Sequence, residues 1–181
     1  MPHRPGGILA LDLSSCVGWA YGLTDSRAPR FGCWQLPHIG GEGAKYATFE
    51  NELAAAIGVL CPGSLVLEAS LSLQALAGVS TIAVARQQLT LRGVAYSEAY
   101  RASIPISEVS SDIVRLAILG TSRFAKNQVK YEVVRYCRAQ GWKVPDHNSA
   151  DACLVWQWQV NQLTGTRGVA GRLFAAGVTR Q

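Results

Sequence analysis

The chain has 181 residues, of which 49% are hydrophobic and 16% are charged. This composition excludes a disordered chain, and the length suits one domain with a substantial core. No apolar run approaches the roughly 18 residues of a membrane helix, so we expect no membrane partner. The N-terminal residues show no signal-peptide layout, which favours a cytoplasmic location.

Five cysteines are scattered along the chain without a C-x-x-C pair, and there are only three histidines. This pattern predicts reduced thiols and argues against both a zinc site and a disulfide framework.

The formal net charge of +5 is unevenly distributed. Residues 113–143 contain seven basic side chains and one acid, which gives this segment alone a charge of +6. Such local basicity suits a polyanionic partner such as nucleic acid. A solvated helix face explains the same charges, and the sequence leaves both interpretations open.

Strand and helix patterns alternate along the chain. Apolar runs predict strands at residues 8–13, 17–23, 30–36, 64–68 and 104–109. Helical spacing predicts helices at residues 42–60, 72–99, 126–140 and 150–163, with a short helical turn opening at residues 110–112 and a loop at 144–149. Three closely spaced strands indicate an antiparallel meander, and the βα alternation after them predicts a mixed five-stranded α/β sheet with helices on both faces. Residues 1–164 form the expected domain, and residues 165–181 a loosely ordered tail.

Three acids stand in apolar surroundings, where a carboxylate is costly unless it is paired or binds a metal. Asp12 lies in the first strand, Glu68 ends the fourth, and Asp151 falls in the first turn of the last helix. If the first and fourth strands are neighbours, all three acids can meet at one end of the sheet, with Asn148 or Asp146 beside them. Clustered carboxylates raise each other's pKa, and a bound divalent cation removes that repulsion.

Each acid also has a simpler explanation. Asp12 could pair with an arginine, Glu68 could cap a strand end, and Asp151 could be an ordinary acid at a helix N-terminus.

Four segments together resemble the RuvC family of Holliday junction resolvases, which belongs to the ribonuclease H-like superfamily. They are Asp12 followed by Gly18, Leu65-Val66-Leu67-Glu68, Lys126-Asn127-Gln128-Val129, and Asn148-Ser149-Ala150-Asp151-Ala152. Arg115 precedes Lys126 by eleven positions, where the family often has another base, and Leu91-Arg92-Gly93-Val94-Ala95 resembles an Arg-Gly segment of the family. The resemblance covers residues 8–163.

This resemblance implies a ribonuclease H-like fold and an endodeoxyribonuclease that resolves four-way or branched DNA by paired symmetric nicks. It implies two Mg²⁺ ions per active site, replaceable by Mn²⁺, with ligands drawn from Asp12, Glu68, Asp151, Asn148 and Asp146. Lys126 would contact the scissile phosphate. The DNA contacts would come from Arg115, Arg123, Lys126, Lys130 and Arg135. We also expect a homodimer that pairs through the long helix. The expected location is the cytoplasm of a bacterium or of a phage-infected host cell.

The chain departs from the family at three places. Leu13-Ser14-Ser15 replaces the usual Pro-Gly, Asn148 stands where Asp or His is common, and no aromatic residue follows Glu68 within six positions. A related nuclease acting on structured RNA and a catalytically weak DNA-binding relative therefore remain alternatives. An actin-like or sugar-kinase-like ATP-binding domain opens with a similar first strand, but the chain is short for one and has no second Gly-rich phosphate loop.

Overall fold

The computed structural model describes residues 6–69, 82–125 and 128–166. Along the chain these form β1 (Ile8–Asp12), β2 (Cys16–Gly22), β3 (Arg30–Gln35), α1 (Gly41–Leu60), β4 (Ser64–Glu68), α3 (Ile82–Arg101), β5 (Ile106–Val109), α4 (Ser111–Leu119), α5 (Gln128–Ala139) and α6 (His147–Thr164). The predicted tail begins where α6 ends, and from residue 167 onward it lies outside the described residues.

The five strands form one mixed sheet in the order β3-β2-β1-β4-β5. β1 pairs antiparallel with β2 and β2 antiparallel with β3, whereas β4 runs parallel to both β1 and β5. This topology confirms the mixed α/β sheet and its antiparallel start. It also places β1 directly beside β4, as the joint position of Asp12 and Glu68 requires.

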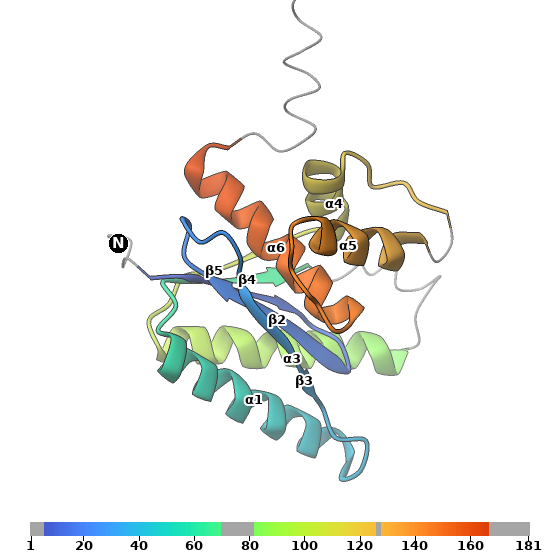
Figure 1. The fold of residues 1–181 in the computed structure, drawn as a ribbon. Helices are drawn as coiled ribbons and strands as arrows, with labels where there is room; N and C mark the ends of the chain where they lie inside the picture. Colours follow the sequence, from blue (N-terminus) through green and yellow to red (C-terminus); the bar gives the residue numbers. More distant parts are fainter. Residues whose placement is uncertain (1–5, 70–81, 126–127, 167–181) are drawn as a thin grey trace, which may run out of the picture.

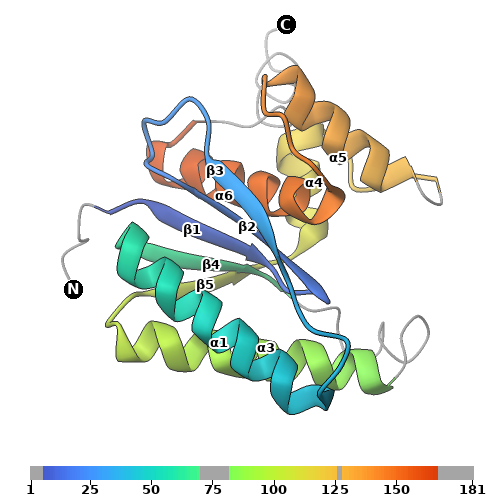
Figure 2. The same cartoon turned by 60° about the horizontal axis from the view of Figure 1, so that its bottom comes forward.

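Helices cover both faces of the sheet, with α4, α5 and α6 on one side and α1 and α3 on the other (Figure 1). In β1, Ile8 and Ala10 belong to the core under α6, and Leu9 and Leu11 belong to the core over α1 and α3. Both faces of the strand are therefore buried, which accounts for its continuous apolar sequence. The α1 and α3 helices lie side by side beneath the sheet (Figure 2).

Small residues on β2 allow α6 to lie close against the sheet. A Cβ atom at Gly22 would come within 2.9 Å of the Trp156 ring, and the Trp156 indole N–H donates to the Gly22 carbonyl at 3.2 Å. At Gly18 a Cβ atom would lie only 2.1 Å from the Asn148 main-chain oxygen. The first turn of α6 therefore packs directly on β2 opposite Asp12, because Gly18 is the pairing partner of Asp12.

Several predicted boundaries need correction. The last helix begins at His147 rather than at residue 150, because the Asp146 side chain accepts from the Ser149 N–H and caps it. The expected turn at residues 110–112 is a nine-residue helix, α4, capped by Ser110. The long helix is described from Ile82 to Arg101, and the part of its predicted range before residue 82 lies outside the described residues.

The cysteine prediction is wrong for one pair. Cys16 on β2 and Cys33 on the neighbouring strand β3 form a disulfide, with their Cα atoms 5.9 Å apart. Strand pairing brings together two residues whose spacing in the sequence showed no motif. Cys61, Cys137 and Cys153 remain free thiols.

Across the described ranges, no helix combines the length and apolar character that a membrane crossing requires.

Candidate active site

Asp12 and Glu68 lie at the same end of two neighbouring strands. The parallel register pairs Leu11 with Leu67, so Asp12 and Glu68 each follow a paired position at the C-terminal end of β1 and β4. Asp12 lies two positions after Ala10, and Glu68 lies two positions after Val66. Ala10 and Val66 are buried under α6, and residues two apart in a strand share a face, so both acids lie on the α6 face. The expected meeting of these two acids is therefore a consequence of register and strand alternation.

The helix α6 brings the third acid to this sheet end. Asp151 raises the pKa of Asp12, and Glu68 in turn raises the pKa of Asp151. Asn148 lies three residues before Asp151 and so shares its side of the helix. Asp146 has another role, because its two carboxylate oxygens accept from Ser149, from the N–H at 2.8 Å and from the hydroxyl at 3.0 Å.

Burial and repulsion from nearby acids raise the pKa of all three carboxyl groups. Burial is the largest cause for each of them, and it raises the pKa of Asp12 well above its usual value. Burial and the nearby Glu68 raise the pKa of Asp151 to about 7. The pKa of Glu68 is also raised, chiefly by burial. Buried carboxyl groups with raised pKa values destabilise the metal-free fold, and such groups are typical of functional sites.

Two residues of α4 act in the opposite direction on Glu68. The Arg115 guanidinium and a hydrogen bond from the Ser111 hydroxyl both lower the pKa of its carboxyl group. Arg115 belongs to the basic set predicted to touch DNA, and its side chain is 21% exposed. Ser111 was not predicted, because a serine at the start of a helix carries no sequence signal beyond capping.

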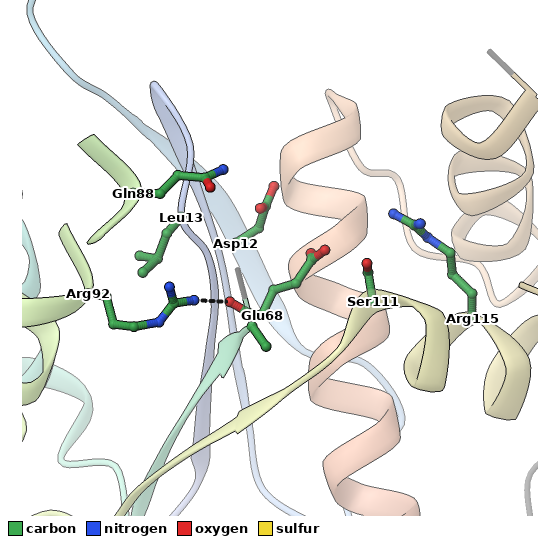
Figure 3. A pocket seen from close by; sticks show the side chains of 8 residues that line it. Asp12, Leu13, Glu68, Gln88, Arg92, Ser111 and Arg115 are labelled. Carbon is green, nitrogen blue, oxygen red and sulfur yellow. Dashed lines mark hydrogen bonds between the residues drawn. The ribbon is translucent and has the colours of Figure 1, made fainter. Parts of the chain in front are cut away.

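These groups line a pocket of about 280 Å³ at the end of the sheet. Asp12 and Glu68 stand in its centre, Ser111 and Arg115 form one wall, and Gln88 and Arg92 from α3 form the other (Figure 3). The α3 wall was not predicted as part of the site. The helix lies on the opposite face of the sheet and reaches the pocket only around the strand ends.

Of the other basic residues predicted to bind DNA, only Lys130 is seen, within the described part of the chain, to act on the carboxyl groups of the site. Lys130 on α5 lowers the pKa of both Asp12 and Asp151 and contacts the His147 ring at 3.1 Å. Arg123 is exposed in the loop after α4, and Arg135 is exposed on α5, where its Nε donates to Glu132 at 2.9 Å. Lys126, predicted to contact the scissile phosphate, lies outside the described residues.

The donors at this site suit a hard divalent cation. Three carboxylates and an amide oxygen offer only oxygen ligands, which Mg²⁺ and Mn²⁺ prefer, and a cation would relieve the repulsion that raises their pKa values. Among residues 6–69, 82–125 and 128–166, no three acidic, histidine or cysteine side chains converge tightly enough to hold a metal ion. The chemistry of the donors therefore fits the ion, but their separation does not form a closed site.

The sheet order, the flanking helices and the carboxylates at the strand ends define an α/β protein with a ribonuclease H-like fold. The fold is similar to that of RuvC: the chain superposes on Thermus thermophilus RuvC with a TM-score of 0.69 at 14% identity, covering 90% of this chain and 98% of that one. T. thermophilus RuvC in complex with Holliday junction substrate matches with a TM-score of 0.68 at 15% identity and the same coverage.

A eukaryotic structure shares the fold as well. The yeast mitochondrial Holliday junction resolvase Ydc2 matches with a TM-score of 0.59 at 12% identity, covering 95% of this chain and 85% of that one. No protein-family model and no curated protein sequence matches the chain. At these identities the likeness concerns the fold, and the site must be argued from its own residues.

Proposed function

We propose that this protein is a divalent-metal-dependent endodeoxyribonuclease that cuts four-way or otherwise branched DNA. One observation carries the proposal: Asp12 and Glu68 end adjacent parallel strands on the face where α6 delivers Asp151. Glu68 and Asp151 both raise the pKa of Asp12, and Glu68 raises that of Asp151. Such a set of buried acids serves no packing purpose, whereas phosphodiester hydrolysis uses such a set to hold metal ions. Two of the solved structures with this fold support branched DNA as the substrate: T. thermophilus RuvC is in complex with Holliday junction substrate, and yeast Ydc2 is named as a mitochondrial Holliday junction resolvase.

Asp12, Glu68, Asp151 and the Asn148 side-chain oxygen would hold the metal ions. When bound, Mg²⁺ would supply an activated water and neutralise charge on the leaving oxygen. Ser111 and Arg115, which line the pocket with Glu68, favour the ionised form of its carboxyl group. Asp146 is a less suitable ligand than Asn148, since both of its oxygens accept from Ser149. Lys126 is proposed to contact the scissile phosphate on the basis of the family resemblance alone.

The basic side chains of α4, α5 and the loop between them would bind the DNA backbone. Arg115 and Lys130 lie close enough to the carboxylates to act on their pKa, so they would contact phosphates next to the cut. Arg123 and Arg135 are exposed and would contact phosphates further along an arm. Such contacts provide affinity and register without reading sequence.

A homodimer is supported by an exposed seam along α3. We call the α3 seam the residues Ile82, Arg86, Leu89, Gly93, Tyr96 and Tyr100, which are spaced alternately by four and three positions and are all exposed. This is the a/d spacing of a helix that pairs with another helix. Gly93 lies in the middle, and nothing lies within 4 Å of a Cβ atom built there, so two copies of α3 could approach closely at this point. A two-fold dimer would provide two matched sites for paired nicks.

A cleavage assay on a substrate panel tests the function. Synthetic four-way junction, Y-fork, linear duplex and structured RNA are each incubated with the protein in Mg²⁺, in Mn²⁺ and in EDTA. We expect metal-dependent cuts in the junction and little cleavage of linear duplex. Cleavage of the structured RNA alone would favour the RNA-processing alternative. Junction binding without cleavage in any divalent ion would favour a catalytically weak DNA-binding relative.

A further inference from the structure

Arg92 on α3 makes two contacts that meet at the catalytic end of the sheet. Its Nη2 donates to the main-chain carbonyl of Glu68 at 2.8 Å, and its Nε lies 2.7 Å from Oε1 of Glu108 on β5. The side chain is 12% exposed, so it reaches these partners from within the packed interface between α3 and the sheet. One guanidinium therefore ties the last residue of β4 to the edge strand β5.

Glu108 has a second partner that fixes it in turn. The Tyr96 hydroxyl donates to Oε1 of Glu108 at 3.1 Å, and Tyr96 follows Arg92 by one turn of α3. The carboxylate thus accepts a hydrogen bond from Tyr96 and forms an ion pair with Arg92 of the same helix, which restricts its rotamer and that of Arg92. Arg92, Glu108 and Tyr96 are called the anchor network below.

The anchor network acts on the residue whose carboxylate faces Asp12. A hydrogen bond to the Glu68 carbonyl fixes the peptide plane at the end of β4, and the Cα–Cβ direction of Glu68 follows from that plane. Figure 3 shows Arg92 reaching Glu68 from the side away from Ser111 and Arg115. Glu68 is therefore held at its backbone by α3 and at its carboxylate by α4.

Arg92 also presents a donor that the anchor network does not use. Within the described ranges, Nη1 of Arg92 and Oε1 of Gln88 are buried and have no hydrogen-bond partner, and Nε of Arg92 has only its ion-pair contact with Glu108. Both residues line the pocket that Asp12 and Glu68 line. A donor and an acceptor left unpaired beside two carboxylates can be satisfied by a water that bridges them.

We propose that Arg92 is a positioning residue: held by Glu108 and Tyr96, it fixes the end of β4 so that Glu68 presents its carboxylate to a divalent cation together with Asp12. The inference rests on the proposed nuclease function. It adds to the site a residue of α3, the helix on the sheet face opposite α6. Groups that orient metal ligands without touching the ion commonly change metal affinity or activity about 10–100-fold when they are removed.

The test measures metal binding and cleavage separately. Mn²⁺ affinity of the DNA-free protein is determined by calorimetry, and the Mg²⁺ concentration for half-maximal junction cleavage is determined for the same variants. Arg92→Gln is expected to weaken Mn²⁺ binding and to raise the half-saturating Mg²⁺ about tenfold or more. Junction affinity in EDTA should stay at the wild-type level. Arg92→Lys should recover part of the loss, because an ammonium can donate to the Glu68 carbonyl but cannot also reproduce the Nε contact with Glu108.

A matched control exists on the same helix. Arg101 pairs with the exposed Glu50 and with the buried Glu98, and its own side chain is 62% exposed, so Arg101→Gln removes an α3 arginine away from the pocket. We expect wild-type Mn²⁺ affinity and Mg²⁺ dependence for this control. Glu108→Gln and Tyr96→Phe should give smaller shifts in the same direction as Arg92→Gln, and they carry the test if Arg92→Gln does not fold.

Wild-type metal binding in Arg92→Lys, Glu108→Gln and any folded Arg92→Gln would overturn the positioning role. Equal losses in the Arg101→Gln control would also overturn it, since the effect would then belong to α3 as a whole. A wild-type protein that neither binds Mn²⁺ nor cuts the junction contradicts the nuclease function instead, so the two failures are distinguishable.

Discussion

Asp12 is the acid on which both other carboxylates of this site act. It lies on a strand that is buried on both faces, and Glu68 and Asp151 both raise the pKa of its carboxyl group. Such a side chain destabilises the metal-free fold. Its place in a carboxylate cluster at the strand ends is best explained by a role in catalysis.

Replacing Asp12 by Asn should therefore separate stability from activity. Asp12→Asn keeps the side-chain size and removes the repulsion, so we expect the metal-free protein to melt higher, by about 2–4 °C for each kcal/mol gained. Junction cleavage in Mg²⁺ should fall about 10³-fold or more, because several kcal/mol of transition-state stabilisation depend on the cation that Asp12 binds. Thermal melting and single-turnover cleavage measure the two effects.

A conservative change on the surface provides the control. Asp25 is exposed in the turn after β2, and Asp25→Asn should leave melting temperature and cleavage at wild-type values. Substantial cleavage by Asp12→Asn would exclude this carboxylate from the metal site.

The titration of Asp151 predicts how stability depends on pH. Its carboxyl group has a pKa of about 7 in the folded chain and near its ordinary value of 3.8 in the unfolded chain. Between these values the folded state binds more protons than the unfolded state, so stability falls as pH rises. We expect the free energy of unfolding of the metal-free protein to decrease from about pH 4 to pH 7.

Denaturant unfolding at a series of pH values, in EDTA and in Mg²⁺, measures this dependence. Asp151→Asn should flatten the slope in EDTA, and Mg²⁺ should restore stability to the wild type near pH 8. A wild-type stability that rises through the same pH range would show that Asp151 is ionised and well paired without metal.

At the scale of elements, the contact between α6 and β2 positions Asp151. A Cβ atom at Gly18 would overlap the Asn148 main-chain oxygen, so Gly18→Ala must push the first turn of α6 away from the sheet. We expect a loss of about 1–3 kcal/mol in stability, the usual range for overpacking, and a decrease in cleavage because Asp151 moves with the helix. Unfolding in denaturant and junction cleavage check the two effects.

Another glycine offers a matched substitution without the overlap. Gly58 lies inside α1, and nothing lies within 4 Å of a Cβ atom built there. Gly58→Ala should stabilise the protein by up to about 1 kcal/mol and leave cleavage unchanged, as expected for an interior helix position. If Gly18→Ala were as stable and active as Gly58→Ala, the α6 contact would not position the site.

The elements that could be predicted are those whose signal is local. β4 was predicted at its observed bounds, because the three apolar residues Leu65-Val66-Leu67 end at an acid shortly after Cys61-Pro62-Gly63. The start of α6 was missed because His147 and Asn148 are polar and resemble a loop. Only the Asp146 cap and the close contact at Gly18 show that this turn is helical.

The same distinction applies to the site. The placement of Asp12 and Glu68 at one end of the sheet could be predicted, because a carboxylate stands out in an apolar run and the strand order brings the two strand ends together. Arg92 could not be assigned to the site from the sequence. Its proposed role depends on α3 lying beside β5, where the Arg92 guanidinium forms an ion pair with Glu108. The disulfide between Cys16 and Cys33 depended in the same way on strand pairing.

At the scale of the whole molecule, the α3 seam predicts how two copies assemble. Gly93 is exposed in the middle of the seam, and a side chain there meets no atom of its own subunit. Gly93→Leu should therefore fold as a monomer while blocking the close approach of two helices. Light scattering at micromolar concentration should give a dimer for the wild type and a monomer for this variant.

Activity should follow assembly. The monomeric variant is expected to nick junctions without a paired second cut, because each of its subunits binds alone. As a control, Val59→Leu adds a methylene on the exposed side of α1, outside the seam, and should leave the dimer intact. A wild-type protein that scatters as a monomer both alone and on the junction would contradict paired cutting by a dimer.

The most direct test of the central claim, that Asp12, Glu68 and Asp151 form one metal-dependent site for branched DNA, uses a supercoiled plasmid with an extruded cruciform. Two coordinated cuts across the four-way junction convert the plasmid to the linear form, and a single cut gives only the nicked circle. In Mg²⁺ we predict linear product from the wild type and neither product from Asp12→Asn, Glu68→Gln or Asp151→Asn, although all four bind the junction. Linear product from any of the three variants, or no cutting by the wild type in Mg²⁺ or Mn²⁺, would contradict the account.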